Sequence, residues 1–160
     1  MKQIINGRVL TPSGWVDGGS VLINGNKIQE VLCDSTIQPG AEIDAGGNYV
    51  SPGFIDMHVH GGGGRDFMEG TEEAFRVAVD AHMQYGTTAI YPTLSSSTVE
   101  MIEEACETCT KLMAEENSPI LGLHLEGPYF NMKMAGAQIP EWIKAPIAEE
   151  YEPLLDKYPC

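Results

Sequence analysis

The sequence has few positive charges: 9 Lys and Arg residues stand against 23 Asp and Glu residues, and the formal net charge is −14. Proteins that bind nucleic acid normally present a basic surface, so this balance argues against a nucleic-acid partner. No apolar run approaches the roughly 18 residues that span a membrane, and the N-terminal residues lack the apolar core of a signal peptide. We therefore expect a cytoplasmic protein with neither a nucleic-acid nor a membrane partner.

Cysteine is also scarce, with four residues in the chain. Cys106 and Cys109 form a CxxC pair, which could be redox-active or could supply half of a zinc site. Both fall in a helical pattern with apolar neighbours at i, i+3 spacing, and the sequence contains no second CxxC pair. We predict that these two cysteines are structural thiols on the buried face of a helix.

Residues 1–50 have few aromatic side chains but many strand and turn signals. Asn6-Gly7 is the strongest short hairpin signal, and Asn24-Gly25-Asn26 predicts a second hairpin between strands at 20–23 and 27–32. Further turns are marked at residues 12–14 and 17–19, and a short strand is predicted at 41–44. These elements predict a small β-rich domain that is too short for an independent sandwich and needs strands from elsewhere.

The stretch 51–64, SPGFIDMHVHGGGG, carries the first sign of chemistry. Residues 54–59 read as a short strand, and side chains alternate along a strand, so His58 and His60 share one face opposite an apolar face. Gly61–Gly64 predicts a loop with almost no side chains, which would let a ligand approach the backbone closely. Two imidazoles beside bare backbone suggest a metal ion with room for a ligand.

The rest of the chain alternates between helix and strand. The predicted elements are a helix capped by Thr71 that runs through residue 85, a strand at 87–93, a helix from the capping box Ser97-Thr98-Val99-Glu100 to about residue 116, a strand at 120–125 and an acidic helix at 147–155. This order is the βαβ rhythm of a parallel sheet with right-handed crossovers, so we predict an α/β fold.

Glu126 ends the third predicted strand, directly before Gly127-Pro128. The carboxyl ends of parallel strands converge on one mouth of an α/β barrel, so Glu126 can meet His58 and His60 although they are distant in sequence. Two histidines and a carboxylate suit zinc or another divalent transition metal. The alternative is that Glu126 is a solvated loop carboxylate and that the two histidines are an incidental surface pair.

The two remaining histidines are not assigned as ligands. His82 lies in the apolar stripe of the first predicted helix, which favours a helix-face residue over a ligand. His124 shares the inward face of the third strand with Glu126 and is expected beneath the site. Residues 132–138 predict a loop over the mouth of the barrel, and a short turn or helical start is expected at 140–144.

Two motifs resemble those of a known family. Pro52–Gly62, PGFIDMHVHGG, resembles the first-strand signature of the amidohydrolase superfamily, which dihydroorotases and hydantoinases share. Gly122–Asn131, GLHLEGPYFN, resembles a narrower group, the N-acetylglucosamine-6-phosphate deacetylases, and GRDFMEG at Gly64–Gly70 strengthens this resemblance. The similarity covers essentially the whole chain. It implies a small β-sandwich domain at 1–50, joined to a metal-bearing (β/α)8 barrel whose first part is 51–160.

The resemblance also implies roles for single residues. Glu126 corresponds to the metal-binding glutamate of the family, and His58 and His60 correspond to ligands from the first strand. The implied metal is zinc, with iron, manganese or cobalt as alternatives. Downstream of the glutamate the family carries Gly-Ala-His or Gly-Thr-His, which contacts the sugar, and the matching residues here include Ala137 and Gln138. Glutamine donates and accepts hydrogen bonds but cannot carry the positive charge of a histidine.

The implied activity is removal of the acetyl group from N-acetylglucosamine 6-phosphate, an amino-sugar phosphate. A complete barrel needs roughly 250 residues, and the family's catalytic aspartate, its carbonyl-polarising histidine and two further metal-binding histidines lie on later strands. We therefore expect an N-terminal portion of the enzyme that has no catalytic residue of its own, is inactive alone and forms homo-oligomers. Two alternatives stay open: another amidohydrolase that acts on cyclic amides, and a non-catalytic metal-binding half-barrel.

Overall fold

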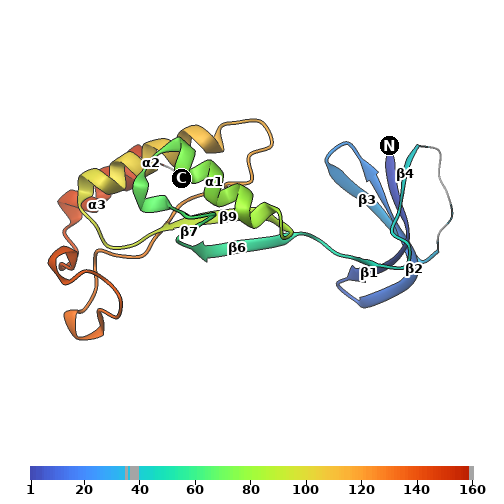
Figure 1. Ribbon diagram of the computed structural model, residues 1–160, viewed down its shortest axis with the longest axis horizontal. Helices are drawn as coiled ribbons and strands as arrows, with labels where there is room; N and C mark the ends of the chain where they lie inside the picture. Colours follow the sequence, from blue (N-terminus) through green and yellow to red (C-terminus); the bar gives the residue numbers. More distant parts are fainter. Residues whose placement is uncertain (35, 37–39, 159–160) are drawn as a thin grey trace. The chain divides into compact units, whose positions relative to one another are not determined.

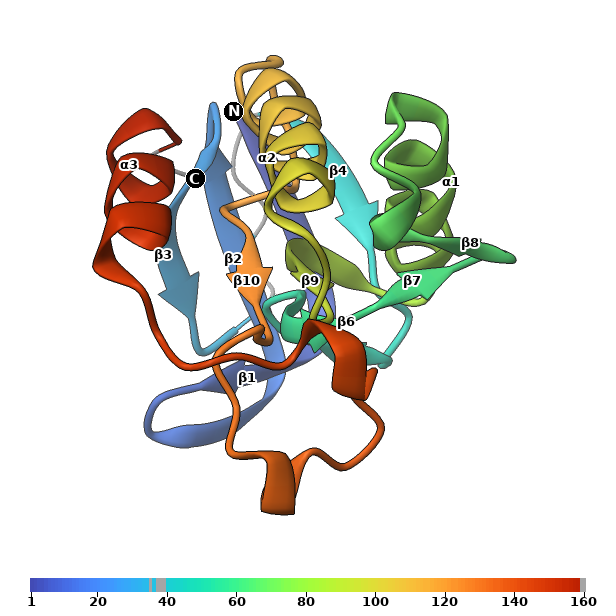
Figure 2. The ribbon, with the colours of Figure 1, turned by 90° about the vertical axis from the view of Figure 1, so that its left-hand side faces the viewer.

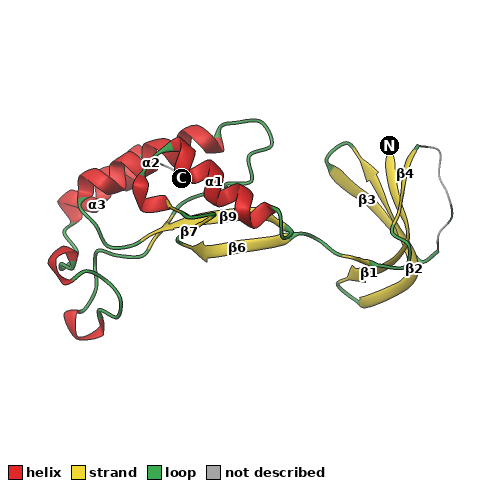
Figure 3. Cartoon of the chain, viewed as in Figure 1, coloured by secondary structure: helices red, strands yellow, loops and turns green. Residues whose placement is uncertain are grey.

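The computed structural model describes residues 1–34, 36 and 40–158, and the chain divides into two units, Met1–Pro52 and Gly53–Cys160. The first unit is built of strands, and the second mixes strands with helices (Figure 1, Figure 3). The α/β class predicted from the sequence is therefore confirmed. None of the described helices has the length and apolar character that a membrane crossing requires.

The first unit is a five-stranded sheet. Its strands are β1 (Lys2–Thr11), β2 (Gly14–Asn24), β3 (Lys27–Leu32), β4 (Ala41–Asp44) and β5 (Tyr49–Val50). The first three strands pair antiparallel, whereas β4 and β5 both pair parallel to β1 at different positions along it. The hairpin predicted at Asn24-Gly25-Asn26 is confirmed as the turn between β2 and β3, and the predicted turn at residues 12–14 joins β1 to β2.

Two turn signals of this unit do not reverse the chain. Asn6-Gly7, predicted as a hairpin, lies inside β1, and the turn predicted at residues 17–19 lies inside β2. The pairs around them are Ile4–Val21, Gly7–Gly19 and Val9–Val16. One extra residue therefore falls first on β1 and then on β2, which makes two β-bulges of opposite effect. Asn6 and Gly18 take positive φ values of 54° and 66° in these bulges, so they bend the ladder without ending it.

The second unit is built on a three-stranded parallel sheet in the order β10-β9-β6. The sheet consists of β6 (Phe54–Val59), β9 (Thr87–Leu94) and β10 (His124–Leu125). Two further strands of the unit, β7 (Gly61–Gly62) and β8 (Arg65–Asp66), pair with each other. Its helices are α1 (Glu72–Met83), α2 (Val99–Met113) and α3 (Ala148–Lys157), and 3-10 turns lie at Phe67–Glu69, Met132–Met134 and Pro140–Trp142. The three helices lie side by side over one face of the sheet (Figure 1, Figure 2).

The helices of this unit begin close to the predicted positions. The Thr71 side chain caps α1 by accepting a hydrogen bond from the Ala74 N–H, as predicted. The predicted start of α2 is wrong by one residue, because Thr98 and not Ser97 accepts the capping bond from the Met101 N–H. Ser97 is buried and donates its hydroxyl to the Thr98 carbonyl oxygen instead.

The third strand is much shorter than the predicted 120–125. Ile120 forms an isolated parallel bridge with Ile90 of β9, and the next paired residues are His124 and Thr93. Four steps along the third segment thus match three steps along β9, so one extra residue interrupts the ladder between the two contacts. The segment keeps its place beside β9, but only His124–Leu125 forms a regular strand.

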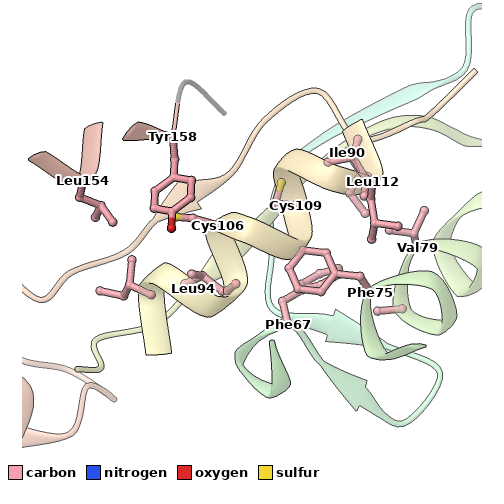
Figure 4. Close-up of a cluster of buried hydrophobic side chains, with 14 residues drawn as sticks. Phe67, Phe75, Val79, Ile90, Leu94, Cys106, Cys109, Leu112, Leu154 and Tyr158 are labelled. Atoms are coloured by element: carbon pink, nitrogen blue, oxygen red, sulfur yellow. The ribbon is translucent and has the colours of Figure 1, made fainter. Parts of the chain in front are cut away.

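The hydrophobic core of the second unit lies between the sheet and the helices (Figure 4). Phe67 and Phe75 are fully buried, and their rings meet edge to face with centroids 4.9 Å apart. Cys106 and Cys109 of α2 are buried in the same core. The interpretation of these cysteines as core residues is confirmed.

The apolar face predicted for β6 is only partly covered. Val59 packs against the core, whereas Ile55 and Met57 are 62% and 70% exposed. Among the described residues β6 pairs in its sheet only with β9, so it is an edge strand. An exposed apolar strand at a sheet edge favours association with another chain.

Candidate metal centre

Two strands and the segment after a third bring the predicted donors together. His58 lies in β6, and His60 follows its last residue, so the alternation of the strand turns both imidazoles to the same side. Glu126 follows β10, and its N–H donates to the Leu94 carbonyl oxygen at the end of β9, at 2.8 Å. The carboxylate is therefore held at the same edge of the sheet as the two histidines.

The three side chains form one compact group. His60 Nε2 lies 3.0 Å from Glu126 Oε2, and His58 Nε2 lies 3.6 Å from the same oxygen. One ligand atom from each residue lies within 4.8 Å of the other two. The side chains are 51% exposed for His58, 40% for His60 and 29% for Glu126, so the group remains open to solvent on one side.

The chemistry of this group fits a divalent transition metal. Imidazole nitrogen and carboxylate oxygen bind zinc at about 2.0–2.2 Å, and tetrahedral ligands at such a distance lie about 3.4 Å from one another. The two nitrogen–oxygen distances in the group lie on either side of that value. Three protein donors with an open side are also the arrangement of catalytic zinc sites, which keep a position for water or substrate.

A serine hydroxyl directly after β9 supports the group, and the sequence analysis missed it. Ser95 Oγ lies 3.2 Å from His60 Nδ1, which leaves the other ring nitrogen directed at Glu126. Metal-binding histidines usually engage their second nitrogen in this way, which fixes the tautomer and the orientation of the ring. The signal was present in the sequence, because Thr93 and Ser95 alternate at the carboxyl end of the strand next to the histidines.

His124 lies beside the donor group without belonging to it. Its ring centroid is 4.9 Å from that of His58, with the planes at 51°. Its Nδ1 lies 3.2 Å from Thr93 Oγ1. His82 is bound elsewhere, since its Nε2 lies 2.9 Å from the Gly61 carbonyl oxygen and links α1 to β7. Among the described residues, neither of these two histidines belongs to the group of clustered donors.

The glycine run after His60 is an ordered hairpin, so the predicted bare loop is wrong. β7 and β8 pair antiparallel around Gly63 and Gly64, which take positive φ values of 60° and 82°. A Cβ on Gly61 would lie 2.1 Å from the Arg65 carbonyl oxygen, and one on Gly62 would lie 2.9 Å from the Ala78 carbonyl oxygen. The glycines allow this hairpin to close and to pack against α1.

Glu69 fixes the base of the same hairpin. Its carboxylate accepts the Asp66 N–H at 3.0 Å and pairs with Arg65 at 3.0 Å. The Asp66 N–H bond and, after it, the positive charge of Arg65 lower the pKa of Glu69 from its ordinary value of 4.5. Asp66 completes a reciprocal capping box by accepting the Met68 N–H.

Of the two predicted sugar-contact residues, one has a clear anchor. Gln138 Oε1 accepts a hydrogen bond from the Ser96 N–H at 2.8 Å. Ser96 directly follows Ser95, the serine that contacts His60. Ala137 is exposed in the same loop. Gln138 therefore ties the loop that follows Glu126 to the carboxyl end of β9, and neither residue is among the three clustered donors.

A cavity of about 320 Å³ lies elsewhere in this unit and is not the donor group. It is lined mostly by apolar residues of α2, of α3 and of the segment after β10. None of the three clustered donors lines it. The candidate site is therefore identified by its donor chemistry and not by the size of a cavity.

Comparison with known proteins shows that the sequence of this chain is similar to those of one enzyme family. A sequence model described as the amidohydrolase family matches residues 49–157. The N-acetylglucosamine-6-phosphate deacetylase of Haemophilus influenzae is 30% identical over 143 residues, which are 88% of this chain and 38% of that protein. The enzyme of the same name from Bacillus subtilis is 32% identical over 151 residues, 90% of this chain and 38% of that protein.

Structural similarity agrees with the sequence matches. A crystal structure of N-acetylglucosamine-6-phosphate deacetylase from Pasteurella multocida superposes with a TM-score of 0.89 at 27% identity. The superposition covers 97% of this chain and 41% of that one. The chain thus spans about 38–41% of the length of these relatives, and the resemblance inferred from its motifs is confirmed.

Proposed function

The chain belongs to the amidohydrolase family, and we propose that it contributes the first part of a metal centre that removes the acetyl group from N-acetylglucosamine 6-phosphate. The family match at residues 49–157 includes all three clustered donors. Because the chain spans only 38–41% of its relatives, this activity is proposed for a protein that also contains the remaining strands. Alone, the chain is expected to be inactive.

The observation that carries this proposal is the contact of Glu126 with both histidines. The motif that contains Glu126 is the one that resembles the deacetylases most specifically, and its carboxylate lies 3.0 Å and 3.6 Å from the nitrogens of His60 and His58. A solvated loop carboxylate would not need to lie beside two imidazoles that come from another strand. The geometry therefore supports a ligand role for all three.

In the proposed mechanism His58, His60 and Glu126 would hold a divalent metal, with zinc preferred and iron, manganese or cobalt as alternatives. When bound, such an ion lowers the pKa of a water molecule and polarises the amide carbonyl. Glu126 contributes the negative charge of the ligand set, and Ser95 orients His60. The general base that takes the proton of the water is assigned to a later strand, in keeping with the family resemblance.

We also propose that Ala137 and Gln138 contact the sugar. The Gln138 carbonyl oxygen is engaged by the Ser96 N–H, which leaves the side-chain amide N–H groups to donate to a sugar oxygen. A neutral amide there recognises a hydroxyl or carbonyl oxygen. It does not supply positive charge for the 6-phosphate, so we assign phosphate recognition to other residues.

The proposed architecture follows from the family. Residues 51–160 would form the first βα units of a (β/α)8 barrel, and residues 1–50 would form part of a small β-sandwich domain. The parallel order β10-β9-β6 with helices over one face supports the first assignment. A homo-oligomer in the cytoplasm, acting on a small amino-sugar phosphate, completes the proposal.

Acetate release from N-acetylglucosamine 6-phosphate tests this function. The product of the complete reading frame should release acetate in the presence of Zn²⁺, and its Glu126→Gln variant should not. Activity on dihydropyrimidines without activity on the acetylated sugar would select the cyclic-amide hydrolase. A reading frame that stops at Cys160, with no activity on either substrate, would select the non-catalytic half-barrel.

A further inference from the structure

The sheet beneath the donor group has a local defect that a single hydroxyl repairs. β6 and β9 pair Asp56 with Ile90 and Val59 with Pro92, so three steps on β6 match two on β9. Pro92 also has no N–H to contribute to the ladder. At this point the Val59 N–H donates to the side chain of Thr93, with a nitrogen–oxygen distance of 3.0 Å. Val59 is the residue between His58 and His60.

The same hydroxyl makes a second contact. Thr93 is fully buried, and its Oγ1 lies 3.2 Å from His124 Nδ1. Because Oγ1 already accepts the Val59 N–H, its own hydrogen needs an acceptor away from solvent. An unprotonated Nδ1 on His124 can serve as that acceptor. The His124 ring then packs in a fixed orientation against the His58 ring.

We propose that Thr93 is a positioning residue of the metal centre. Its hydroxyl holds the backbone between the two histidine ligands and sets the tautomer of His124, against which the ring of His58 packs. Ser95, two residues further along the chain and directly after β9, holds the ring of His60. The carboxyl end of β9 and the residue after it thus align both histidines through side chains. This inference rests on the proposed metal centre.

Two Thr93 variants separate positioning from filling of the core. Thr93→Val keeps the shape of the side chain and removes both hydrogen bonds, whereas Thr93→Ser keeps the hydroxyl. Thr88→Val is the matched control, because Thr88 lies at the other end of β9, is exposed and makes a long 3.5 Å contact with the Phe54 carbonyl oxygen. The probes are Co²⁺ affinity from an absorption titration, hydrogen exchange of the Val59 amide and the ¹⁵N shifts of the His124 ring.

We expect Thr93→Val to weaken Co²⁺ binding by about 10- to 100-fold, the usual effect of losing a group that supports a metal ligand. It should also speed exchange of the Val59 amide and abolish the single tautomer of His124. Thr93→Ser should restore all three properties, and Thr88→Val should leave them unchanged. Unchanged Val59 exchange in Thr93→Val, or failure of serine to rescue, would overturn the proposal.

The remaining outcomes are also decisive. If the wild-type chain binds no Co²⁺, the three donors do not hold an ion without the later strands, and the Val59 exchange and His124 tautomer still decide whether Thr93 aligns this segment. If Thr93→Val does not fold, the ¹⁵N shifts of the His124 ring in the wild-type chain decide, because they show which ring nitrogen carries the proton. A proton on Nδ1 of His124 contradicts the assigned hydrogen bond and sinks the proposal, whereas a proton on Nε2 alone supports it.

Discussion

His60 Nε2 lies 3.0 Å from Glu126 Oε2, although the two residues follow different strands with two helices between them in the chain. The contact depends on the backbone bond from the Glu126 N–H to the Leu94 carbonyl oxygen, which places the carboxylate at the end of β9. The two histidines of the ligand set therefore come from β6 and its end, and the carboxylate comes from the residue after β10.

Replacement of Glu126 by glutamine should weaken metal binding. The amide has the same shape but no negative charge, and its NH2 group cannot act as a ligand. We expect the wild-type chain to bind Co²⁺ too weakly to retain it during gel filtration, because the remaining family ligands are expected on later strands. In an equilibrium titration Glu126→Gln should lower the affinity by at least about tenfold, roughly 1.4 kcal/mol. Equal affinity in Glu126→Gln and in the exposed control Glu149→Gln would contradict a ligand role.

Removal of the Ser95 hydroxyl should loosen His60 without unfolding the chain. Ser95→Ala removes the partner of His60 Nδ1, so the ring should sample other orientations, and the affinity for Zn²⁺ should fall by about tenfold. Ser95→Thr keeps the hydroxyl and should bind as the wild type does. Competition with a chromophoric chelator measures both affinities. If the alanine and threonine variants bind equally well, Ser95 does not orient the ligand.

Gln138 should hold the loop after Glu126 against β9. Gln138→Ala removes the acceptor of the Ser96 N–H, a loss of about 0.5–1.5 kcal/mol for a typical hydrogen bond. The Ser96 amide should therefore exchange faster, and proteolysis at residues 131–138 should speed up. Gln138→Glu retains a side-chain oxygen and serves as the comparison. Unaltered exchange at Ser96 in the alanine variant would show that another group holds the loop.

Acid should weaken the hairpin at Glu69. The pKa of Glu69 in the folded chain is lowered, first by the Asp66 N–H bond and then by Arg65. Its contribution to stability is thus fully present above the ordinary pKa of 4.5 and is lost as the pH falls through the lower folded value. Glu69→Gln should reduce the pH dependence of the free energy of unfolding in that window. Urea titrations at successive pH values measure it, and an unchanged slope would refute the assignment.

The exposed edge of β6 should drive self-association. Ile55 and Met57 present apolar side chains on a strand with an open edge, and such edges pair with other chains. Light scattering of the wild-type chain should therefore give a mass above that of the monomer. Ile55→Lys with Met57→Lys should shift it toward the monomer, whereas Tyr85→Lys, which changes an exposed aromatic residue outside the strand, should not. A monomeric wild-type chain would rule out this association.

The donor group could be predicted because its signal is local and periodic. Alternation along β6 places His58 and His60 on one face, and the strand-end rule brings Glu126 to the same edge. The sequence also predicts the burial of Cys106 and Cys109, since the pattern of a helix repeats every turn. Each of these predictions needs only the type of element and the phase of its side chains.

What could not be predicted depends on register between segments. The Asn-Gly signal at residues 6 and 7 is the same for a hairpin and for a bulge, and only the pairing partner distinguishes them. The bond from the Val59 N–H to Thr93 arises because Pro92 and an extra residue on β6 shift the ladder by one step. Gln138 gains its partner through a loop whose path no local pattern specifies.

The paired bulges of β1 and β2 have a consequence for how this sheet tolerates mutation. Side chains alternate with a period of two, so deletion of one residue would invert every later position of its strand. Here an extra residue on β1 is balanced by one on β2 within a few positions. A deletion at Asn6 would therefore be suppressed by a second deletion at Gly18, because the two losses together restore the phase. The lengths of the two strands are therefore coupled, and we expect insertions or deletions in one to be tolerated only with a matching change in the other.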